Sequence, residues 1–359
     1  MRKRITGLKM KILMLGLLIS AASLQAQISD VGNMITGAKT DGEALFKAYL
    51  TPYANALGAD LSGGWYNTAK PHKLGGFDIT LTFNMALVPS QDKTFDLNNI
   101  ENFSGDYDHN NSLAPTVAGS KEVGPQITYS EQGVDLASFN TPKGTGVGFI
   151  PTPMVQLGVG LIKGTEVIGR FMPTVDVANS GSSVGLWGIG LKHSLKQWIP
   201  AINRIPVLHL SVMGGYTKLT TNSELSVMPG DIGLPSSASD ATTFNNQAMG
   251  LEVSSFTMNL LVSANLPVIS FYGGVGISST KMSLALTGNY PMGTVTNGQA
   301  DVTVTTDPFN MTIKNTDGST TNPRLNAGLR LKLGVITIHG DYTYANYSVV
   351  TAGLGVSLR

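Results

Sequence analysis

The chain has no cysteine among its 359 residues, which excludes disulfide bonds, thiolate metal sites and a cysteine nucleophile. Charged residues are scarce at 13%, whereas soluble domains usually contain about 25%. The formal net charge of +1 lacks the basic excess of nucleic-acid-binding proteins, so we expect no nucleic acid as a partner. After the N-terminal region, no segment offers the roughly 18 uninterrupted apolar residues that a membrane-spanning helix needs.

The N-terminus has the layout of a secretory signal peptide. Its positive region contains Arg2, Lys3, Arg4, Lys9 and Lys11. An apolar run at 12–19 follows, and small residues lead to Ala26. This order predicts a signal peptide at 1–26 and export of the mature chain to the periplasm, the medium or the outer membrane. The strand pattern described next favours the cell outer membrane.

Regular alternation of apolar and polar residues is the main pattern of the mature chain. In the segment 77–87 every odd position is apolar, and the even positions carry Asp78, Thr80, Thr82, Asn84 and Ala86. The same rhythm returns at 155–161, 208–216, 256–264, 269–277, 325–333 and 350–358. Successive side chains of a strand point to opposite faces, and a tilted strand crosses a bilayer in about 9–11 residues. The pattern therefore predicts an all-β fold, a transmembrane antiparallel β-barrel with outer-membrane lipid on its apolar face.

The number of strands follows from counting these segments. Nine strands are predicted after residue 150, and strands near 60–66, 76–87 and 93–99 make about 12. A further hairpin from 126–129 and 146–150 makes about 14, and both totals satisfy the even number of bacterial barrels. With the C-terminus in the periplasm, the short turns near 163–164, 265–267 and 334 are periplasmic, and the connections 178–183, 220–249 and 281–322 lie outside the cell.

Residues 27–58 differ from the barrel sequence at 59–359. Ala44, Leu45, Ala48 and Tyr49 fall near helical spacing, and Asp41 can cap such a helix. This short N-terminal helical segment is interpreted as a plug of the lumen, with packing on the periplasmic rim or simple tethering as alternatives.

Inward positions of the predicted strands supply candidate lumen residues. They are Glu166, Arg170, His209, Arg324, Arg330, Lys332, His339 and Asp341. Inward charges either select solutes or form an ion-pair network that stiffens the wall. Ile162, Ile168 and Met172 are also read as inward, which predicts a mixed rather than a purely wet lumen.

The connection at 194–206 has helical spacing of apolar residues, and Trp198 is predicted to anchor it at the membrane interface. An ordinary turn with a tucked tryptophan is the alternative.

We expect no catalytic residues, no cofactor and no metal. His209 with Ser211, and His339 with Asp341, each share a strand face but are read as polar lumen residues. Asp106, Asp108 and Asn110 have calcium-loop spacing, yet the required glycine and glutamate are replaced by Asn111 and Val117. The chain is therefore predicted not to be an enzyme.

Several segments carry a resemblance to a known family. They read GFDITLTFNMALVP, GLIKGTEVIGRFMP, KHSLKQWIPAINRIPVLHLSVMGGYTKL and DYTYANYSVVTAGLGVSLR. Together they resemble a family of uncharacterised Gram-negative outer-membrane barrels, which is similar in layout to the FadL-type transporters of hydrophobic compounds. The chain departs from the usual terminal phenylalanine of such barrels, because it ends in Leu358 and Arg359.

The helical N-terminal segment and the mixed lumen predict a passive uptake channel for small apolar or amphipathic compounds. A small hydrophobic ligand is then the expected partner. The alternative is a structural or accessory barrel in an outer-membrane assembly or secretion complex, with other outer-membrane proteins as partners.

Overall fold

The computed structural model describes residues 39–101, 103, 107–131, 134–177, 181–232, 234–297, 299–314 and 321–358. The predicted signal peptide, 1–26, and the first part of the predicted helical segment, 27–38, lie outside these ranges. Among the described residues, no helix is long and apolar enough to cross a bilayer.

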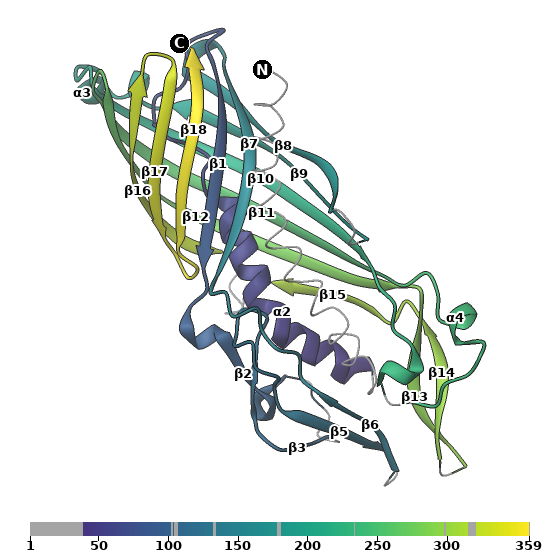
Figure 1. Cartoon of the computed structure of the whole chain (residues 1–359). Coiled ribbons are helices and arrows are strands. Elements are labelled where there is room, and N and C mark those ends of the chain that lie inside the picture. The colour runs from purple at the N-terminus through teal and green to yellow at the C-terminus, as the bar shows by residue number, and fades with distance from the viewer. Residues whose placement is uncertain are drawn as a thin grey trace.

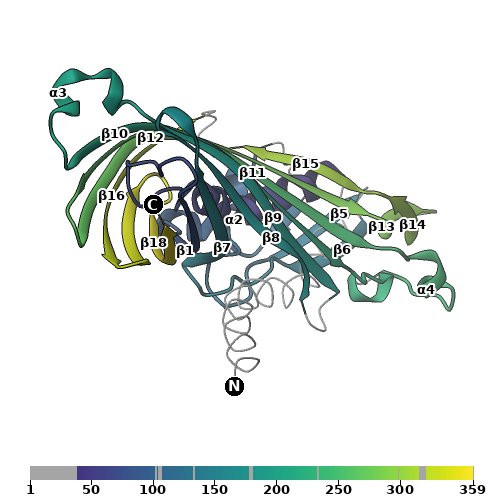
Figure 2. The same ribbon diagram turned by 90° about the horizontal axis from the view of Figure 1, so that it is seen from above.

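Ten antiparallel strands of the described chain close into a barrel (Figures 1 and 2). They are β1 (Phe77–Leu87), β7 (Phe149–Gly160), β8 (Thr165–Val177), β9 (Ser182–Ser194), β10 (Leu208–Glu224), β11 (Ala248–Asn265), β12 (Ile269–Thr287), β16 (Asn322–Leu333), β17 (Ile336–Tyr344) and β18 (Val349–Leu358). β1 pairs with β18, and the β11–β12 pairing completes the ring. The predicted transmembrane β-barrel is confirmed, because the alternation along β1 places its polar residues inside and leaves Ile79 half exposed on the outer wall.

The predicted strand number of 12 to 14 is wrong for the closed wall. The segment 60–66 is not a strand, because it contains the end of a helix and a chain segment inside the barrel. The segment 93–99 forms β2 (Thr94–Asp96) and a short turn of helix (Leu97–Asn99) outside the ring. A strand joins a barrel only if both of its edges find partners, and neither segment has a place between two wall strands.

Further strands lie beyond one end of the barrel. β2 pairs with β4 (Leu113–Pro115), and β3 (Tyr107–His109), β5 (Gln126–Glu131) and β6 (Val134–Asn140) form a small sheet. β13 (Asn289–Thr296) pairs with β14 (Gln299–Thr306), and β15 (Phe309–Lys314) pairs with the extension of β12. A short helix, α4 (Asp240–Thr243), also lies there (Figure 1). We call this the distal end, and the opposite end, which carries α3 (Pro200–Asn203) and residue 358, the C-terminal rim.

The interior of the barrel is occupied by the chain's own N-terminal part. Helix α2 (Lys39–Ser62) contacts β1, β7, β10, β11, β12 and β15. Gly58 lets the helix approach β12 closely, since a Cβ at Gly58 would come within 2.2 Å of the Thr280 side chain. Leu45, Phe46 and Leu61 are completely buried. The barrel therefore has a packed core rather than an open pore.

Candidate functional site: the lumen around helix α2

The C-terminal end of α2 is held by two arginines of the barrel wall. Arg170 of β8 donates from its two terminal nitrogens to the carbonyls of Leu61, at 2.9 Å, and Gly63, at 2.5 Å. Arg324 of β16 donates to the carbonyl of Ser62 at 2.6 Å. The last turn of α2 contains no basic residue of its own. The wall therefore supplies the positive charge that unsatisfied carbonyls at a helix C-terminus favour.

Arg170 also organises the segment that follows the helix. Its guanidinium carbon lies 3.6 Å from the ring centroid of Trp65, and its Nε donates to Gln156 at 3.0 Å. The indole of Trp65 fits against two glycines of the wall: a Cβ at Gly190 or at Gly215 would come within 2.7 or 2.6 Å of its ring. Arginine stacked on a desolvated indole gains a cation–π attraction in addition to its hydrogen bonds.

Asp60 forms a second connection between α2 and the wall. Its Oδ2 accepts a hydrogen bond from Thr152 at 2.8 Å, and its backbone carbonyl accepts one from the Asn84 amide at 2.6 Å. The other carboxylate oxygen, Oδ1, has no partner among the described residues. Burial raises the pKa of the Asp60 carboxyl well above its ordinary value, because the charged form has lost its water.

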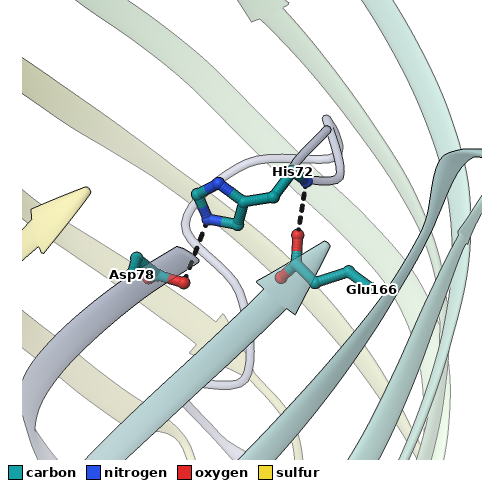
Figure 3. A group of neighbouring side chains, drawn as sticks. All are labelled: His72, Asp78 and Glu166. Carbon is teal, nitrogen blue, oxygen red and sulfur yellow. Dashed lines mark hydrogen bonds and ion pairs between the residues drawn. The ribbon is translucent and has the colours of Figure 1, made fainter. Parts of the chain in front are cut away.

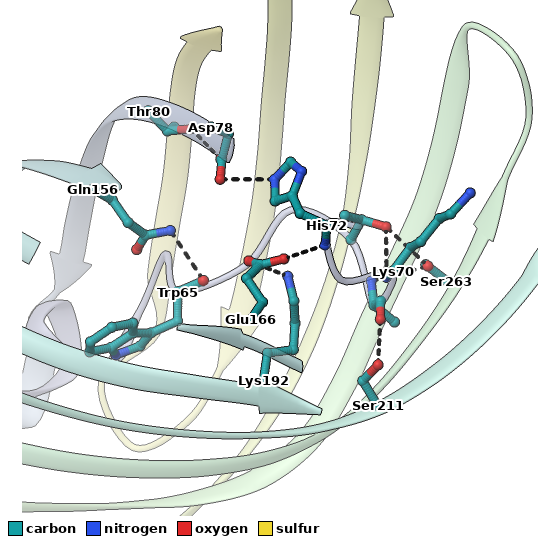
Figure 4. Close-up of polar contacts among 12 residues, drawn as sticks. Trp65, Lys70, His72, Asp78, Thr80, Gln156, Glu166, Lys192, Ser211 and Ser263 are labelled. Carbon is teal, nitrogen blue, oxygen red and sulfur yellow. Dashed lines mark hydrogen bonds and ion pairs between the residues drawn. The ribbon is translucent and has the colours of Figure 1, made fainter. Parts of the chain in front are cut away.

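Residues 63–76, which we call the lumenal strap, run from the end of α2 to β1 along the inner wall (Figure 4). Ser211 donates to the carbonyl of Ala69, and Ser263 accepts from the Ala69 amide at 3.1 Å. The amide of His72 donates to Glu166 at 2.8 Å, and its Nε2 lies 3.0 Å from Asp78 (Figure 3). The strap is therefore bonded to strands on several sides of the barrel.

His72, Asp78 and Glu166 offer ligand atoms within 4.8 Å of one another, a grouping that can hold a metal ion. Lys192 already places its ammonium 2.9 Å from Glu166, and His72 is bonded to Asp78. All of these side chains are buried, and each of the two carboxylates already has a hydrogen-bonding or ion-pairing partner within the cluster. We interpret it as an ion-pair network that fixes the strap.

The structure places the predicted lumen residues at separate points of the inner wall. Arg170 and Arg324 meet at the end of α2, and Glu166 lies in the ion-pair network. Asp341 accepts from Tyr272 at 2.9 Å and from Asn326 at 2.7 Å. The remaining predicted residues are His209, Arg330 and His339, all buried, and Lys332, which is half-buried.

Other sequence expectations have mixed outcomes. Ile168 and Met172 are buried, but Ile162 is 63% exposed because it lies in the turn between β7 and β8 rather than on a strand. Trp198 is 68% exposed at the C-terminal rim, in the helical connection between β9 and β10.

Sequence reasoning missed Asp60, Trp65, His72 and Lys192. The inward position of Lys192 could have been predicted from the alternation along β9, because the residue lies on the buried side of that strand.

The wall between β7 and β8 is incompletely paired. The two strands pair only from Gly160 opposite Glu166 to Val155 opposite Phe171. Beyond that point β7 continues to Phe149 and β8 to Val177 without pairing to each other. On its other side β7 pairs with β1 along its whole length. We call the unpaired stretches, 149–154 and 172–177, the β7–β8 seam.

Prolines occupy the edges of this seam. The amide of Leu87 donates toward β18, and the amide of Val88 donates toward β7. The backbone N–H and C=O groups of even residues in β1 therefore point toward β7, and those of their even-numbered partners in β7 point back toward β1. The backbone edge of the odd positions of β7, which include Pro151 and Pro153, consequently points toward β8. On β8, Pro173 lies in the register shift between Met172 and Val175. Proline has no N–H to donate, so at Pro151 and Pro153 the edge of β7 presents no donor that would need a partner in hydrocarbon.

Comparison with solved structures returns outer-membrane barrels of several kinds. The OmpT protease of Escherichia coli shares 9% identity with a TM-score of 0.33, over 79% of this chain and 96% of that one. The transport unit of the autotransporter AIDA-I from E. coli shares 9% identity with a TM-score of 0.34, over 87% of this chain and 99% of that one. The TodX monoaromatic hydrocarbon channel shares 10% identity with a TM-score of 0.28, over 84% of this chain and 69% of that one. These values carry no argument about activity.

The sequence matches none of the curated proteins with which it was compared. A family model described as "Family of unknown function (DUF6588)" matches residues 1–358. The chain, an outer-membrane type of β-barrel, therefore belongs to the DUF6588 family.

Proposed function

We propose that this barrel is a passive uptake channel for small apolar or amphipathic compounds, exported by a signal peptide at 1–26 and plugged by α2 and the lumenal strap. The observation that carries the proposal is the combination of a packed lumen with an unpaired wall. The axis is filled by α2, whereas the β7–β8 seam interrupts the hydrogen-bonded wall within the span of β1. Water-soluble ions gain nothing from such a seam, but an apolar compound can pass through it into lipid.

The side chains behind the seam fit this route. Ile150 and Met172, from the two strands, belong to the buried apolar cluster that contains much of α2. Thr152 is the polar exception and is bonded to Asp60. An apolar compound beside α2 would therefore meet mainly aliphatic groups before it reached the membrane.

The seam is tested by restoring the missing donors. Replacing Pro151, Pro153 and Pro173 together by valine should allow β7 and β8 to pair further and should slow entry of the apolar dye N-phenyl-1-naphthylamine into cells that express the chain. Pro323→Val is the matched control, because Pro323 lies in β16 within a continuous pairing with β12. Equal dye entry in the triple variant and the unmodified chain, at equal amounts in the membrane, refutes the route.

The plug is tested in liposomes. Deleting 27–58 should raise leakage of small sugars, and Arg170→Ala, which keeps the whole chain, should raise it to a smaller extent. Unchanged permeability in both variants would refute the hypothesis that the N-terminal part of the chain plugs the lumen.

A structural or accessory role in an outer-membrane assembly is the second candidate, favoured by the sheets at the distal end. The β5–β6 and β13–β14 hairpins stand outside the closed ring (Figure 1) and offer surfaces to a partner. Pull-down in mild detergent separates the candidates, since a channel that acts alone should be recovered without a stoichiometric partner.

A further inference from the structure

A pocket of about 590 Å³ lies at the distal end beside the first half of α2. Thr51 and Pro52 of the helix form one side, the segment 92–101 forms another, and Ile313 of β15 closes the third. Figure 1 shows this part of α2 between β15 and β2. The volume is within the range of roughly 300–1,000 Å³ that small-molecule sites occupy.

The pocket has an apolar part made by residues from separate segments. Ala44 and Ala48 line it from α2, and Phe95 and Ile100 line it from the segment 92–101. An alkyl or aryl group is the ligand portion that such a lining favours, and Phe95 adds a ring face to which a cation is attracted.

Charge in the pocket is predominantly negative. Its lining contains Asp92, Asp96 and Glu101 but a single basic residue, Lys47. Lys47 lies 3.7 Å from Glu101, so this pair is largely neutral. Two carboxylates remain to set the local potential.

Both remaining carboxylates are held by neutral donors. Asp96 accepts from the backbone amide and side chain of Asn98 and from the side chain of Asn99. Asp92 accepts from the hydroxyl of Tyr347. Within the described part of the chain, neither carboxylate forms an ion pair. Two acidic residues of the pocket lining therefore lack a cationic partner among the described residues, which favours a cationic group in the adjoining cavity.

We propose that this pocket binds amphipathic cations, in which an ammonium group meets Asp92 and Asp96 and an apolar tail lies between α2 and Phe95. A role of this pocket as the first binding site for compounds that enter the barrel rests on the proposed uptake function, whereas the binding of cations itself does not. A ligand with the same tail and a negative head group meets two unpaired carboxylates and is rejected.

Three compounds with one carbon skeleton test this assignment: 4-phenylbutylamine, 4-phenylbutanol and 4-phenylbutyrate. Isothermal titration of the full mature chain in lipid nanodiscs, with empty nanodiscs subtracted, measures their affinities. We expect the amine to bind at least fivefold more tightly than the alcohol, and the carboxylate more weakly than the alcohol. Asp92→Asn with Asp96→Asn should reduce the amine's advantage over the alcohol to less than twofold.

Two further variants keep the result interpretable. Glu122→Gln removes an exposed acid outside the pocket lining and should leave the preference unchanged. Ala48→Trp fills the cavity and should weaken amine and alcohol alike by about tenfold or more. Equal binding of amine and carboxylate, or full binding to the filled pocket, overturns the proposal. Dye entry through the seam uses an uncharged compound, so failure of the uptake function is recognised separately.

Discussion

Removal of the Arg170 side chain gives the most direct measure of how firmly α2 is held. Arg170→Ala deletes three hydrogen bonds from a buried guanidinium and its contact with Trp65, and it leaves the carbonyls of Leu61 and Gly63 without this donor. Hydrogen bonds to charged groups contribute about 1.5–3 kcal/mol each. Burial of the cation itself opposes them. We therefore expect a net loss of about 3 kcal/mol, well below the simple sum.

This loss should be visible as local opening of the helix. About 3 kcal/mol corresponds to a change of roughly 100-fold in an equilibrium constant. Hydrogen–deuterium exchange of the backbone amides at 55–62 should accelerate by about this factor if exchange follows local opening. In Arg170→Lys the exchange rate should lie between those of the unmodified chain and Arg170→Ala, because a lysine has no planar group that can contact two carbonyls and an indole at once.

The control is Arg204→Ala, which removes an exposed arginine at the end of α3. It should leave exchange at 55–62 unchanged. If Arg170→Ala accelerates exchange of the α2 amides less than threefold, the wall arginine does not hold the helix, and the reasoning from its hydrogen bonds is refuted.

Three other predictions concern the same lumen. Because the pKa of Asp60 is raised in the folded state, its contribution to stability is fully present below the ordinary pKa of an aspartate and is lost as pH rises through the raised value. With the intrinsic base-catalysed exchange rate divided out, the opening constant of the amides at 55–62 should therefore increase with pH in the unmodified chain and stay nearly constant in Asp60→Asn. Gly190→Ala should displace Trp65 and red-shift its fluorescence in a background without the other two tryptophans, at a cost of about 1–3 kcal/mol, whereas Gly169→Ala, with no atom within 4 Å of its added Cβ, should not. Lys192→Met leaves Glu166 buried without its cation and should lower unfolding stability in denaturant by about 3–5 kcal/mol, against less than about 1 kcal/mol for Lys218→Met at the more exposed pair with Glu252; equal losses contradict the assignment.

The helix shows how far local pattern carried the prediction. Helical spacing at Ala44, Leu45, Ala48 and Tyr49 indicated a helix, yet α2 continues past the predicted end to Ser62. Its residues are buried on several sides because the barrel surrounds it, so the usual contrast between an apolar and a polar face is weak. The predicted strand at 60–66 is the end of α2 and the beginning of the lumenal strap, and its Leu61, Trp65 and Tyr66 are buried as wall residues would be.

The sequence by itself determined the two faces of the wall, because alternation along a strand is a local property that the pleat converts directly into inside and outside. The apolar and polar positions of 77–87 therefore specified a membrane barrel before any partner strand was known. Only the tertiary structure decided the number of wall strands, the docking of α2 on Arg170 and Arg324, and the seam where β7 leaves β8. The arginine contacts join residues more than a hundred positions apart. The strand number and the seam depend on which strand edges pair, and neither leaves a periodic trace in the chain.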